Sequence, residues 1–487
     1  MEKPTGDKEL LTSSAMRLAG MIRSRRVSSR EVVEAHIRRI EQVNPVINAV
    51  VAKRFEQALK EAHRADEQIS KRGQSEPGLL HGVPCTIKES FALNGMPNTG
   101  GLVARTGHTA DSDATAVARL RAAGAIPLGV TNVSELCMWM ESSNRVYGRT
   151  NNPYDPACHV GGSSGGEGAI IAAGGSPLGL AADVAGSIRL PAFFSGVFGH
   201  KPTACLVPNS GQFPIAVNQA GRYLCTGPIT RSAEDLMPLL KIMAGPDGED
   251  PLCRPAQIGD TRCVEAKDLD VFLVTGNAAA KVDAELVSAM RDAADALSAR
   301  GARVETTTIA GLEDSFYIWS AMMDAAGGPS FAELMGQGRA INAWLELLRW
   351  VLGRSEHTLP AIGLAILEKA PALLPGLQEK YLDRAPRLKD ELNKKLGPRG
   401  VMLYPTFTCT AQRHNLPLLR FFHSGYTSIV NVMELPATQV PLGLGSRGLP
   451  MGVQVVANAG NDHLSIAVAE ILETELGGWV PPWQKDS

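Results

Sequence analysis

The chain of 487 residues is 44% hydrophobic and 20% charged, which is the balance of a folded globular protein and excludes a disordered chain. Its 48 lysines and arginines against 50 aspartates and glutamates give a formal net charge of -2. This balance excludes a basic surface for nucleic acid and a polybasic membrane patch. Because the sequence has no signal peptide and no apolar run of about 18–20 residues, we expect a cytoplasmic protein without stable membrane insertion.

The eight cysteines are scattered along the chain without a CxxC pair. Such spacing is typical of reduced, mostly buried thiols in a cytosolic protein, and zinc ligands would stand closer together. We therefore expect neither a metal site nor a bound cofactor.

The first 75 residues are predicted to form a helical region that packs on the rest of the protein. Ser28 and Glu31 fit a capping box, an apolar helical face follows, and Pro45 is expected to close this helix. A second helix is predicted over residues 55–69. After a glycine-bounded loop, a short apolar strand at 83–87 ends at Lys88.

Residues 76–487 alternate between predicted strands and helices. Buried strands are expected at 126–130 and 178–182, and each is followed further along by a turn rich in small residues. The chain ends with strands at 401–404 and 452–456 and a helix at 461–475. No internal repeat or linker divides this part, so we predict one interwoven α/β domain.

Two glycine–serine turns and one lysine could perform nucleophilic chemistry. Ser163 and Ser187 stand 24 positions apart, each among small residues that would leave its hydroxyl accessible in a cleft. A serine hydroxyl attacks only when a base takes its proton. Lys88 ends an apolar strand, where loss of hydration lowers the pKa of a lysine toward the range of a base.

The sequence resembles the amidase signature family in three blocks, which are residues 82–89, 161–168 and 186–191. Longer runs are similar to the fatty-acid amide hydrolase branch of that family, especially its second vertebrate type, namely residues 132–154, 191–203 and 443–459. The resemblance extends from about Ser28 to Trp479. It implies a single large domain with a central mixed β-sheet covered by helices on both faces, in which residues 82–203 form the core of the signature.

This resemblance implies a serine hydrolase that cleaves carboxamide C–N bonds through an acyl-enzyme. Ser187 would be the nucleophile, Ser163 the proton shuttle after a cis peptide bond, and Lys88 the base. Backbone N–H groups around the nucleophile would form the oxyanion hole, with Val184, Ala185 and Gly186 as its candidates. Three further residues of the matched blocks would support the site, namely Ser164, Asp183 and Arg189.

Three departures from the family pattern affect the expected substrate range. Ala185 stands where the family often has glycine, and Ala182 replaces a polar residue frequently found before Asp183. The sequence also lacks the N-terminal membrane helix of the vertebrate fatty-acid amide enzymes. None of these departures removes a group with a predicted catalytic role.

An apolar substrate is predicted from the residues near the two serine turns. Candidate pocket residues are Cys137, Met138, Trp139 and Phe194. We expect small-molecule amides or anilides with an apolar or aromatic side, and esters and carbamates as further substrates. Residues 340–380 are rich in leucine and tryptophan but broken by glycine and proline, which favours a helical cap over the cleft. A dimer interface or plain core stays open for this segment, and with it a homodimer.

Three alternatives to this hydrolase are considered. Residues 161–165 also match the G-x-S-x-G elbow of α/β-hydrolases, which would need His423 or His463 and a preceding strand. The amidase subunit of a tRNA-dependent amidotransferase would share the catalytic residues but act with partner subunits. A non-catalytic scaffold would not need Lys88, Ser163 and Ser187 together.

Overall fold

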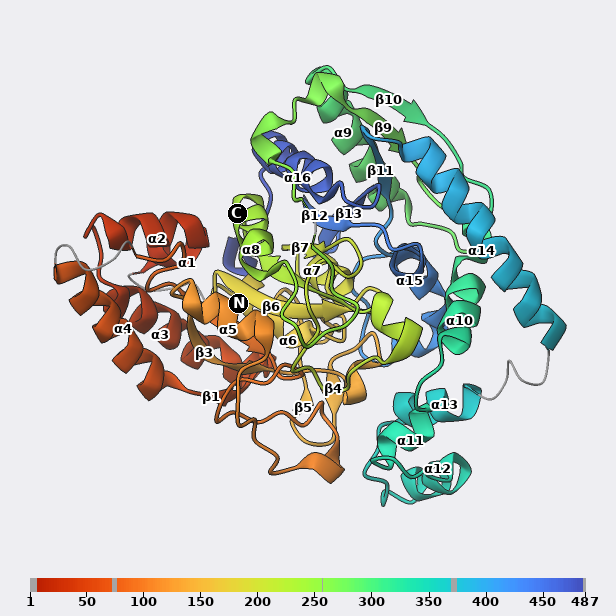
Figure 1. Ribbon diagram of the computed structural model, residues 1–487, viewed down its shortest axis with the longest axis horizontal. Helices are drawn as coiled ribbons and strands as arrows, with labels where there is room; N and C mark the ends of the chain where they lie inside the picture. The colour runs from red at the N-terminus through yellow and green to blue at the C-terminus, as the bar shows by residue number, and fades with distance from the viewer. Residues whose placement is uncertain (1–6, 72–76, 256, 369–374, 485–487) are drawn as a thin grey trace.

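One large mixed sheet forms the centre of the protein (Figure 1). The computed structural model describes residues 7–71, 77–255, 257–368 and 375–484. The sheet has 11 strands in the order β1-β3-β2-β6-β8-β7-β12-β13-β11-β9-β10, and β4 and β5 pair separately. The strands are β1 (Val50–Lys53), β2 (Pro84–Lys88), β3 (Ile126–Thr131), β4 (Ser143–Asn144), β5 (Gly148–Arg149), β6 (Leu178–Asp183), β7 (Phe198–Lys201), β8 (Cys225–Thr230), β9 (Asp270–Leu273), β10 (Arg303–Thr306), β11 (Gly400–Tyr404), β12 (Ala437–Leu444) and β13 (Pro450–Ala457).

Parallel pairing brings several strand ends to one edge of this sheet. β2 runs parallel to both β3 and β6, whereas β6 with β8 and β12 with β13 are antiparallel, so the sheet is mixed as predicted. Lys88 at the end of β2 lies opposite Thr131 at the end of β3. Because the carboxyl ends of parallel strands share an edge, Lys88 lies beside the chain that leaves β6 at Asp183.

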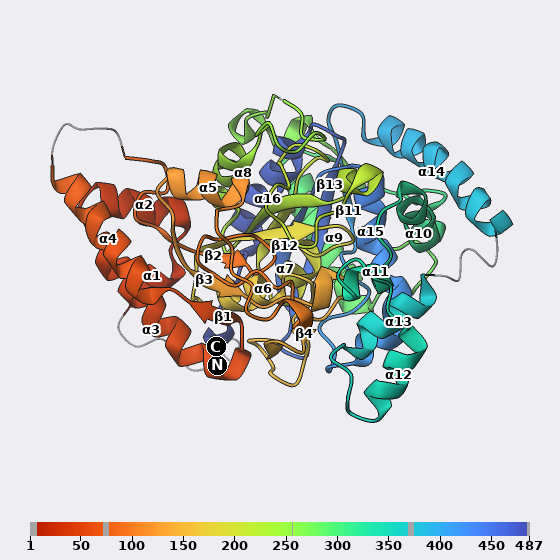
Figure 2. The same cartoon turned by 60° about the horizontal axis from the view of Figure 1, so that its bottom comes forward.

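Helices cover both faces of the sheet, as predicted (Figures 1 and 2). Along β6, Leu178 and Leu180 enter one apolar cluster and Ala181 enters the other, because side chains alternate between the faces of a strand. The helices are α1 (Lys8–Thr12), α2 (Ala15–Arg23), α3 (Ser29–Ile47), α4 (Phe55–Ser70), α5 (Thr115–Ala122), α6 (Gly165–Ala172), α7 (Arg189–Phe194), α8 (Leu236–Met243), α9 (Ala284–Ala299), α10 (Ser315–Ala326), α11 (Phe331–Met335), α12 (Ala343–Val351), α13 (Leu359–Leu367), α14 (Pro375–Leu396), α15 (Gly425–Val432) and α16 (Asp462–Leu476). Helices α5, α8, α9 and α16 pack into the first cluster, and α6, α7, α10 and α15 into the second.

The N-terminal helices confirm one local prediction and correct another. The Ser28 hydroxyl accepts the N–H of Glu31 at 3.1 Å and the Glu31 carboxylate accepts that of Ser28 at 2.7 Å, which is the predicted capping box. The prediction that Pro45 closes the helix is wrong, since α3 continues to Ile47. A proline in the last turn removes a single N–H, and the helix ends where Asn48 turns left-handed with φ 48°. β1 then adds this region to the edge of the sheet.

Helices α11, α12 and α13 form a lobe on the opposite side of the molecule from the N-terminal helices (Figures 1 and 2). It packs on the body through its own apolar cluster, in which Met335 and Ile362 meet Leu136. α12 nevertheless exposes apolar side chains, with 68% of Trp344 and 69% of Val351 accessible, so this helix is not core in the single chain. The predicted cap falls here, and its residues 369–374 lie outside the described residues. None of the described helices has the length and apolar character needed to cross a bilayer.

Candidate active site

Lys88 is completely enclosed at the end of β2. Its side chain is buried and its Nζ lies 2.8 Å from Ser163 Oγ and 3.4 Å from the carbonyl oxygen of Ala182. Burial lowers the pKa of Lys88 from its ordinary value, because a charged ammonium loses its hydration there. The structure therefore places a lysine that readily loses its proton against the hydroxyl of the first predicted serine.

The glycines before and after Ser163 allow this turn to enter the site. A Cβ on Gly162 would lie 2.4 Å from the carbonyl oxygen of Trp139, and one on Gly166 would lie 2.4 Å from the N of Asn132. Only glycine fits such close approaches to backbone atoms. The Gly162–Ser163 peptide bond is cis, as the family resemblance implied. Ser164 directly precedes α6, and its hydroxyl lies 3.4 Å from the carbonyl oxygen of Ala182, which also faces Lys88.

The turn that carries Ser187 is organised by the carboxylate of Asp183. This carboxylate accepts the N–H of Gly186 at 2.6 Å and the N–H of Ile188 at 3.1 Å. Gly186 has φ 122°, and a Cβ at this position would lie 2.3 Å from Thr427 Oγ1. Asp183 and Gly186 thus fix the backbone on both sides of the serine.

A buried ion pair holds that carboxylate in place. Arg189 donates to Asp183 at 3.0 and 3.1 Å, and both side chains are fully buried. Burial alone would raise the pKa of Asp183, but the charge and hydrogen bonds of Arg189 lower it to about 2. Asp183 therefore stays ionised, and the predicted supporting residues Asp183 and Arg189 do come together beneath the nucleophile turn.

Residues of the second half of the chain complete this support, and the sequence analysis did not find them. Arg189 also donates to Asn431 Oδ1 at 2.6 Å and to Gln454 Oε1 at 2.8 Å. Thr427, one turn before Asn431 on α15, donates to the carbonyl oxygen of Ala185 at 2.7 Å. No local motif marks these positions; the polar residues at 427 and 431 share a helix face that only the fold turns toward the site.

The N–H groups around Ser187 differ in their availability. The Gly186 N–H already donates to Asp183, so one of the three candidate oxyanion residues is engaged. Within the described part of the chain, the N–H groups of Val184, Ala185 and Ser187 have no hydrogen-bond partner, and neither has the Ser187 hydroxyl. The φ angle of Ala185 is not positive, so its methyl group causes no strain of the kind found in left-handed backbone.

A second buried carboxyl group lies behind the lysine and was also missed. Glu167 on α6 accepts the hydroxyl of Thr86 at 2.5 Å and that of Thr131 at 2.8 Å. Burial raises the pKa of Glu167 to about 8, and nearby Lys88 opposes that rise. Glu167 thereby ties α6, which begins just after Ser163, to the two strands whose ends position Lys88.

The four candidate pocket residues fall into two groups. Cys137, Met138 and Trp139 are half-buried, and the indole of Trp139 stacks on Phe421 with ring centroids 5.6 Å apart. Phe194 is only 1% exposed, and its ring is enclosed by three other rings, those of His159, Phe193 and Phe407. Phe194 is therefore enclosed in the core, whereas the other three residues keep partial exposure to solvent.

The histidines of the elbow interpretation lie elsewhere. Between β5, which ends at Arg149, and α6, the described chain forms no strand, so the strand that an elbow needs is missing. His423 bonds Thr408 Oγ1 at 2.7 Å, and neither it nor His463 has a hydrogen bond to Ser163 or Ser187 among the described residues.

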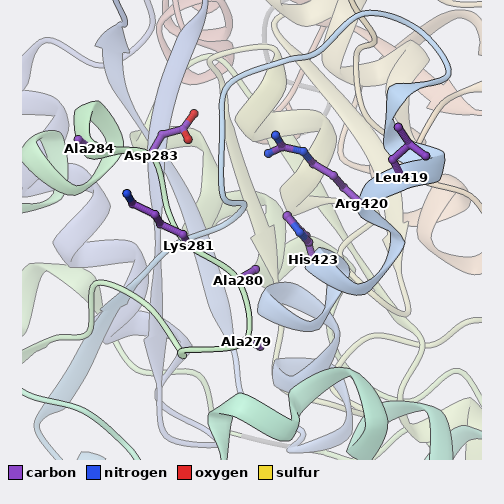
Figure 3. A pocket seen from close by; sticks show the side chains of 8 residues that line it. All are labelled: Ala279, Ala280, Lys281, Asp283, Ala284, Leu419, Arg420 and His423. Carbon is purple, nitrogen blue, oxygen red and sulfur yellow. The ribbon is translucent and has the colours of Figure 1, made fainter.

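His423 instead lines a separate open hollow of about 600 Å³ (Figure 3). Arg420 and His423 lie on one side of it and Lys281 and Asp283 on the other. The hollow contains none of the predicted catalytic residues.

Comparison with known proteins places this site in context. A family model described as Amidase matches residues 31–466. Fatty-acid amide hydrolase 2 of Homo sapiens is 46% identical over 97% of this chain and 91% of its own length. Indoleacetamide hydrolase of Bradyrhizobium diazoefficiens is 33% identical over 95% of this chain and 86% of its own length. The structure of a 6-aminohexanoate cyclic dimer hydrolase complexed with substrate has a TM-score of 0.80 and 28% identity, covering 96% of this chain and 97% of that one.

Proposed function

Starting from the fact that this chain belongs to the amidase family, the amidase signature enzymes, we propose that Ser187 attacks the carboxamide carbonyl while Ser163 and Lys88 carry its proton. The protein is a hydrolase that acts on amide bonds. The observation that carries the assignment of roles is the 2.8 Å contact between the buried Lys88 Nζ and Ser163 Oγ. A base with a lowered pKa at this distance is what serine activation requires.

The reaction proceeds through an acyl-enzyme. Neutral Lys88 takes the hydroxyl proton of Ser163. Ser163 in turn takes the hydroxyl proton of Ser187 while the Ser187 oxygen bonds to the carbonyl carbon of the substrate. The tetrahedral intermediate then collapses, the C–N bond breaks, and the leaving amine receives a proton from Ser163. Water then attacks the ester between the acyl group and Ser187, and the same relay takes its proton. The ester bond breaks, the carboxylic acid leaves, and the Ser187 hydroxyl is restored.

The oxyanion of the intermediate is bound by the unengaged N–H groups of the Ser187 turn. We assign this role to Val184, Ala185 and the serine itself, with Gly186 shaping the turn through its bond to Asp183. Donors fixed before the reaction stabilise developing charge without reorganisation, and each contributes about 3–4 kcal/mol to lowering the barrier.

The substrates are small-molecule amides or anilides with an apolar or aromatic acyl side, and esters and carbamates react at the same site. Support comes from the half-buried Met138 and from Trp139 stacked on Phe421, which offer an apolar surface next to the Ser163 turn. The 46% identity to a protein named for fatty-acid amides is consistent with that class.

The lobe of α11, α12 and α13 acts as a cap on this pocket. Glu135, two residues before Cys137, accepts the N–H of Thr358 at 2.8 Å and bonds the ring of His357 at 2.6 Å. Met138 packs into the apolar cluster of the lobe. The lobe therefore rests directly on the loop that lines the pocket.

We assign residues 76–487 to one domain, with the helical region 1–75 packed against it. We further place the enzyme in the cytoplasm, where its eight free cysteines stay reduced.

Labelling with a fluorophosphonate probe tests the assignment of the nucleophile. The wild-type protein is expected to form a stoichiometric covalent adduct on Ser187, and Ser187→Ala is expected to form none while keeping its fold. Ser195→Ala is the matched control, because Ser195 is a buried serine near the end of α7 whose hydroxyl has no partner among the described residues. It should label normally.

The same experiment separates the alternatives. A scaffold would show no labelling of the wild-type protein. Labelling that persists in Ser187→Ala would place the nucleophile elsewhere. An amidotransferase subunit would label but would hydrolyse apolar anilides only weakly without its partner subunits, whereas we expect turnover by the isolated chain.

A further inference from the structure

The indole of Trp319 reaches the nucleophile turn from α10. Its N–H donates to the carbonyl oxygen of Val184 at 3.2 Å, across 135 positions of the chain. Val184 and Ala185 are half-buried, and they lead from the end of β6 toward Ser187. Trp319 lies outside the three signature blocks, and the proton relay does not use it.

The bond from Trp319 fixes a whole peptide plane of this turn. The two cis peptide bonds of the described chain lie elsewhere, so the bond between Val184 and Ala185 is trans and planar. In a trans peptide the carbonyl and the N–H point in opposite directions. A donor that fixes the Val184 carbonyl therefore also fixes the Ala185 N–H, which has no partner among the described residues and which we assign to the oxyanion.

The two neighbouring peptide planes are held in the same way from α15. The side-chain amide of Asn431 donates to the Asp183 carbonyl oxygen at 2.9 Å, which fixes the next N–H along the chain. The hydroxyl of Thr427 donates to the Ala185 carbonyl oxygen at 2.7 Å. Trp319 supplies the bond between these two, so α10 and α15 together hold three successive carbonyls of the turn.

Packing holds the indole of Trp319 in place. Its ring centroid lies 5.9 Å from that of Phe316, which in turn meets Phe421 edge-on at 4.9 Å. Phe421 stacks on Trp139, one of the candidate pocket residues. A Cβ on Gly425 would lie 3.0 Å from the backbone N of Phe316, so α15 begins directly against α10. Trp319 thus ends an aromatic row that runs from the pocket to the oxyanion donors.

We propose that Trp319 is a positioning residue whose indole N–H holds the Val184 carbonyl and so aims the Ala185 N–H at the oxyanion of the tetrahedral intermediate. The proposal rests on the proposed function, because it assumes that this N–H binds the oxyanion. A donor that is fixed beforehand stabilises developing charge without reorganisation, whereas a donor on a peptide that can turn must first be oriented. Loss of the indole N–H should therefore weaken binding of the transition state more than binding of the substrate.

Two changes remove the indole N–H and keep an aromatic ring at this position. One is Trp319→Phe, and the other is 3-benzothienylalanine in place of Trp319, which keeps the shape of the indole and carries sulfur instead of N–H. For both we expect kcat on an apolar anilide to fall about five- to fiftyfold, part of the roughly 10²–10³-fold cost of a missing oxyanion donor, with little change in KM. The acid limb of the pH profile should not move, because the hydrogen bonds of Lys88 are unchanged.

Inhibitor binding supplies a readout that a change of packing alone would not produce. A trifluoromethyl ketone with the acyl chain of the anilide forms a tetrahedral adduct on Ser187 with a negatively charged oxygen. Its inhibition constant should rise by the factor by which kcat/KM falls. An analogue in which a methylene group replaces the carbonyl carries no such oxygen, so its inhibition constant should stay unchanged.

Controls separate this inference from a loss of fold and from the proposed function. Trp483→Phe is the matched control, because Trp483 is a half-buried tryptophan whose indole nitrogen has no hydrogen-bond partner among the described residues. It should leave kcat, KM and both inhibition constants unchanged. Full activity of the benzothienylalanine enzyme, or equal weakening of the two inhibitors, would overturn the inference, since ring packing would then explain any loss in Trp319→Phe.

The nucleophile variant distinguishes the two levels of the argument. If Ser187→Ala stayed active, the proposed function would fail first. If Ser187→Ala were inactive and both changes at Trp319 left kcat normal, only this inference would fail.

Discussion

The Ser187 turn and the α11–α13 lobe use apolar and polar groups in opposite ways. Around Ser187, charged groups are fully buried and satisfied, with Arg189 bonded to three side chains, those of Asp183, Asn431 and Gln454. On the lobe, large apolar side chains are exposed, including 68% of Trp344 and 56% of Leu348. The first region is held by directed bonds, whereas the second touches the body through one small apolar cluster and a few hydrogen bonds.

This difference indicates how the two regions contribute to function. Directed bonds to buried charges are costly to break, so they fix the geometry of reacting groups. Contacts with an exposed apolar surface do not depend on bond direction, so such a surface can bind apolar molecules of different shapes. We therefore expect changes near Ser187 to abolish chemistry or folding, and changes on α12 to alter only how apolar substrates are handled.

The largest effect is expected from the proton relay. Lys88→Ala should lose nearly all activity and Ser163→Ala several orders of magnitude, in line with the 10²–10⁴-fold usual for one proton-transfer group and its participation in more than one step. Folding should be retained, as checked by circular dichroism. Steady-state kinetics with an anilide substrate measures both effects, and near-normal kcat in Lys88→Ala at pH 7 would refute the relay.

The pH dependence of the wild-type protein sharpens this prediction. Burial lowers the pKa of Lys88, so the neutral, active amine becomes populated below the ordinary lysine pKa. Activity should rise with pH through this lowered pKa and stay high on the alkaline side. A histidine base would give an acid limb near its ordinary pKa of about 6.5, with activity independent of Lys88.

A smaller but decisive effect is expected on stability. Asp183→Asn leaves Arg189 fully buried without its ionic partner, and breaking a buried pair in this way costs about 3–5 kcal/mol. Asp270→Asn is the matched control, because Arg303 and Asp270 form a pair that is largely accessible to solvent, and the loss of such a screened pair has little effect on stability. Urea unfolding measures both, and equal losses would contradict the contrast between buried and exposed charge.

The smallest effect is expected on α12. Replacing Trp344 and Leu348 together by glutamine should leave the free energy of unfolding nearly unchanged, since both side chains are mostly exposed. The kcat/KM for a long apolar anilide should fall several-fold while that for a small amide is maintained, because a cap acts on bulky substrates. Leu79→Gln, at an exposed leucine in another part of the chain, is the control. An equal fall for both substrates would argue against a cap.

Much of the chemistry could be predicted from the sequence because it depends on short segments. The strand ending at Lys88, the glycines that admit Ser163 and the carboxylate that shapes the Ser187 turn all lie within a few residues of the groups they serve. The capping box at Ser28 was found for the same reason, since both partners lie in one helical turn. Pro45 was misjudged because one missing N–H does not end a helix whose other bonds are kept.

By itself the sequence determined the strand that ends at Lys88 and the two serine turns, because local spacing specifies them, and its resemblance to the amidase signature family implied the mixed α/β architecture. Only the tertiary structure decided which distant side chains hold those groups. Gln454 reaches Arg189 across 265 positions, and Thr427 reaches Ala185 across 242. The physical reason is that a hydrogen bond depends on position within a few tenths of an ångström, and for residues so far apart that position is set by strand register and helix packing.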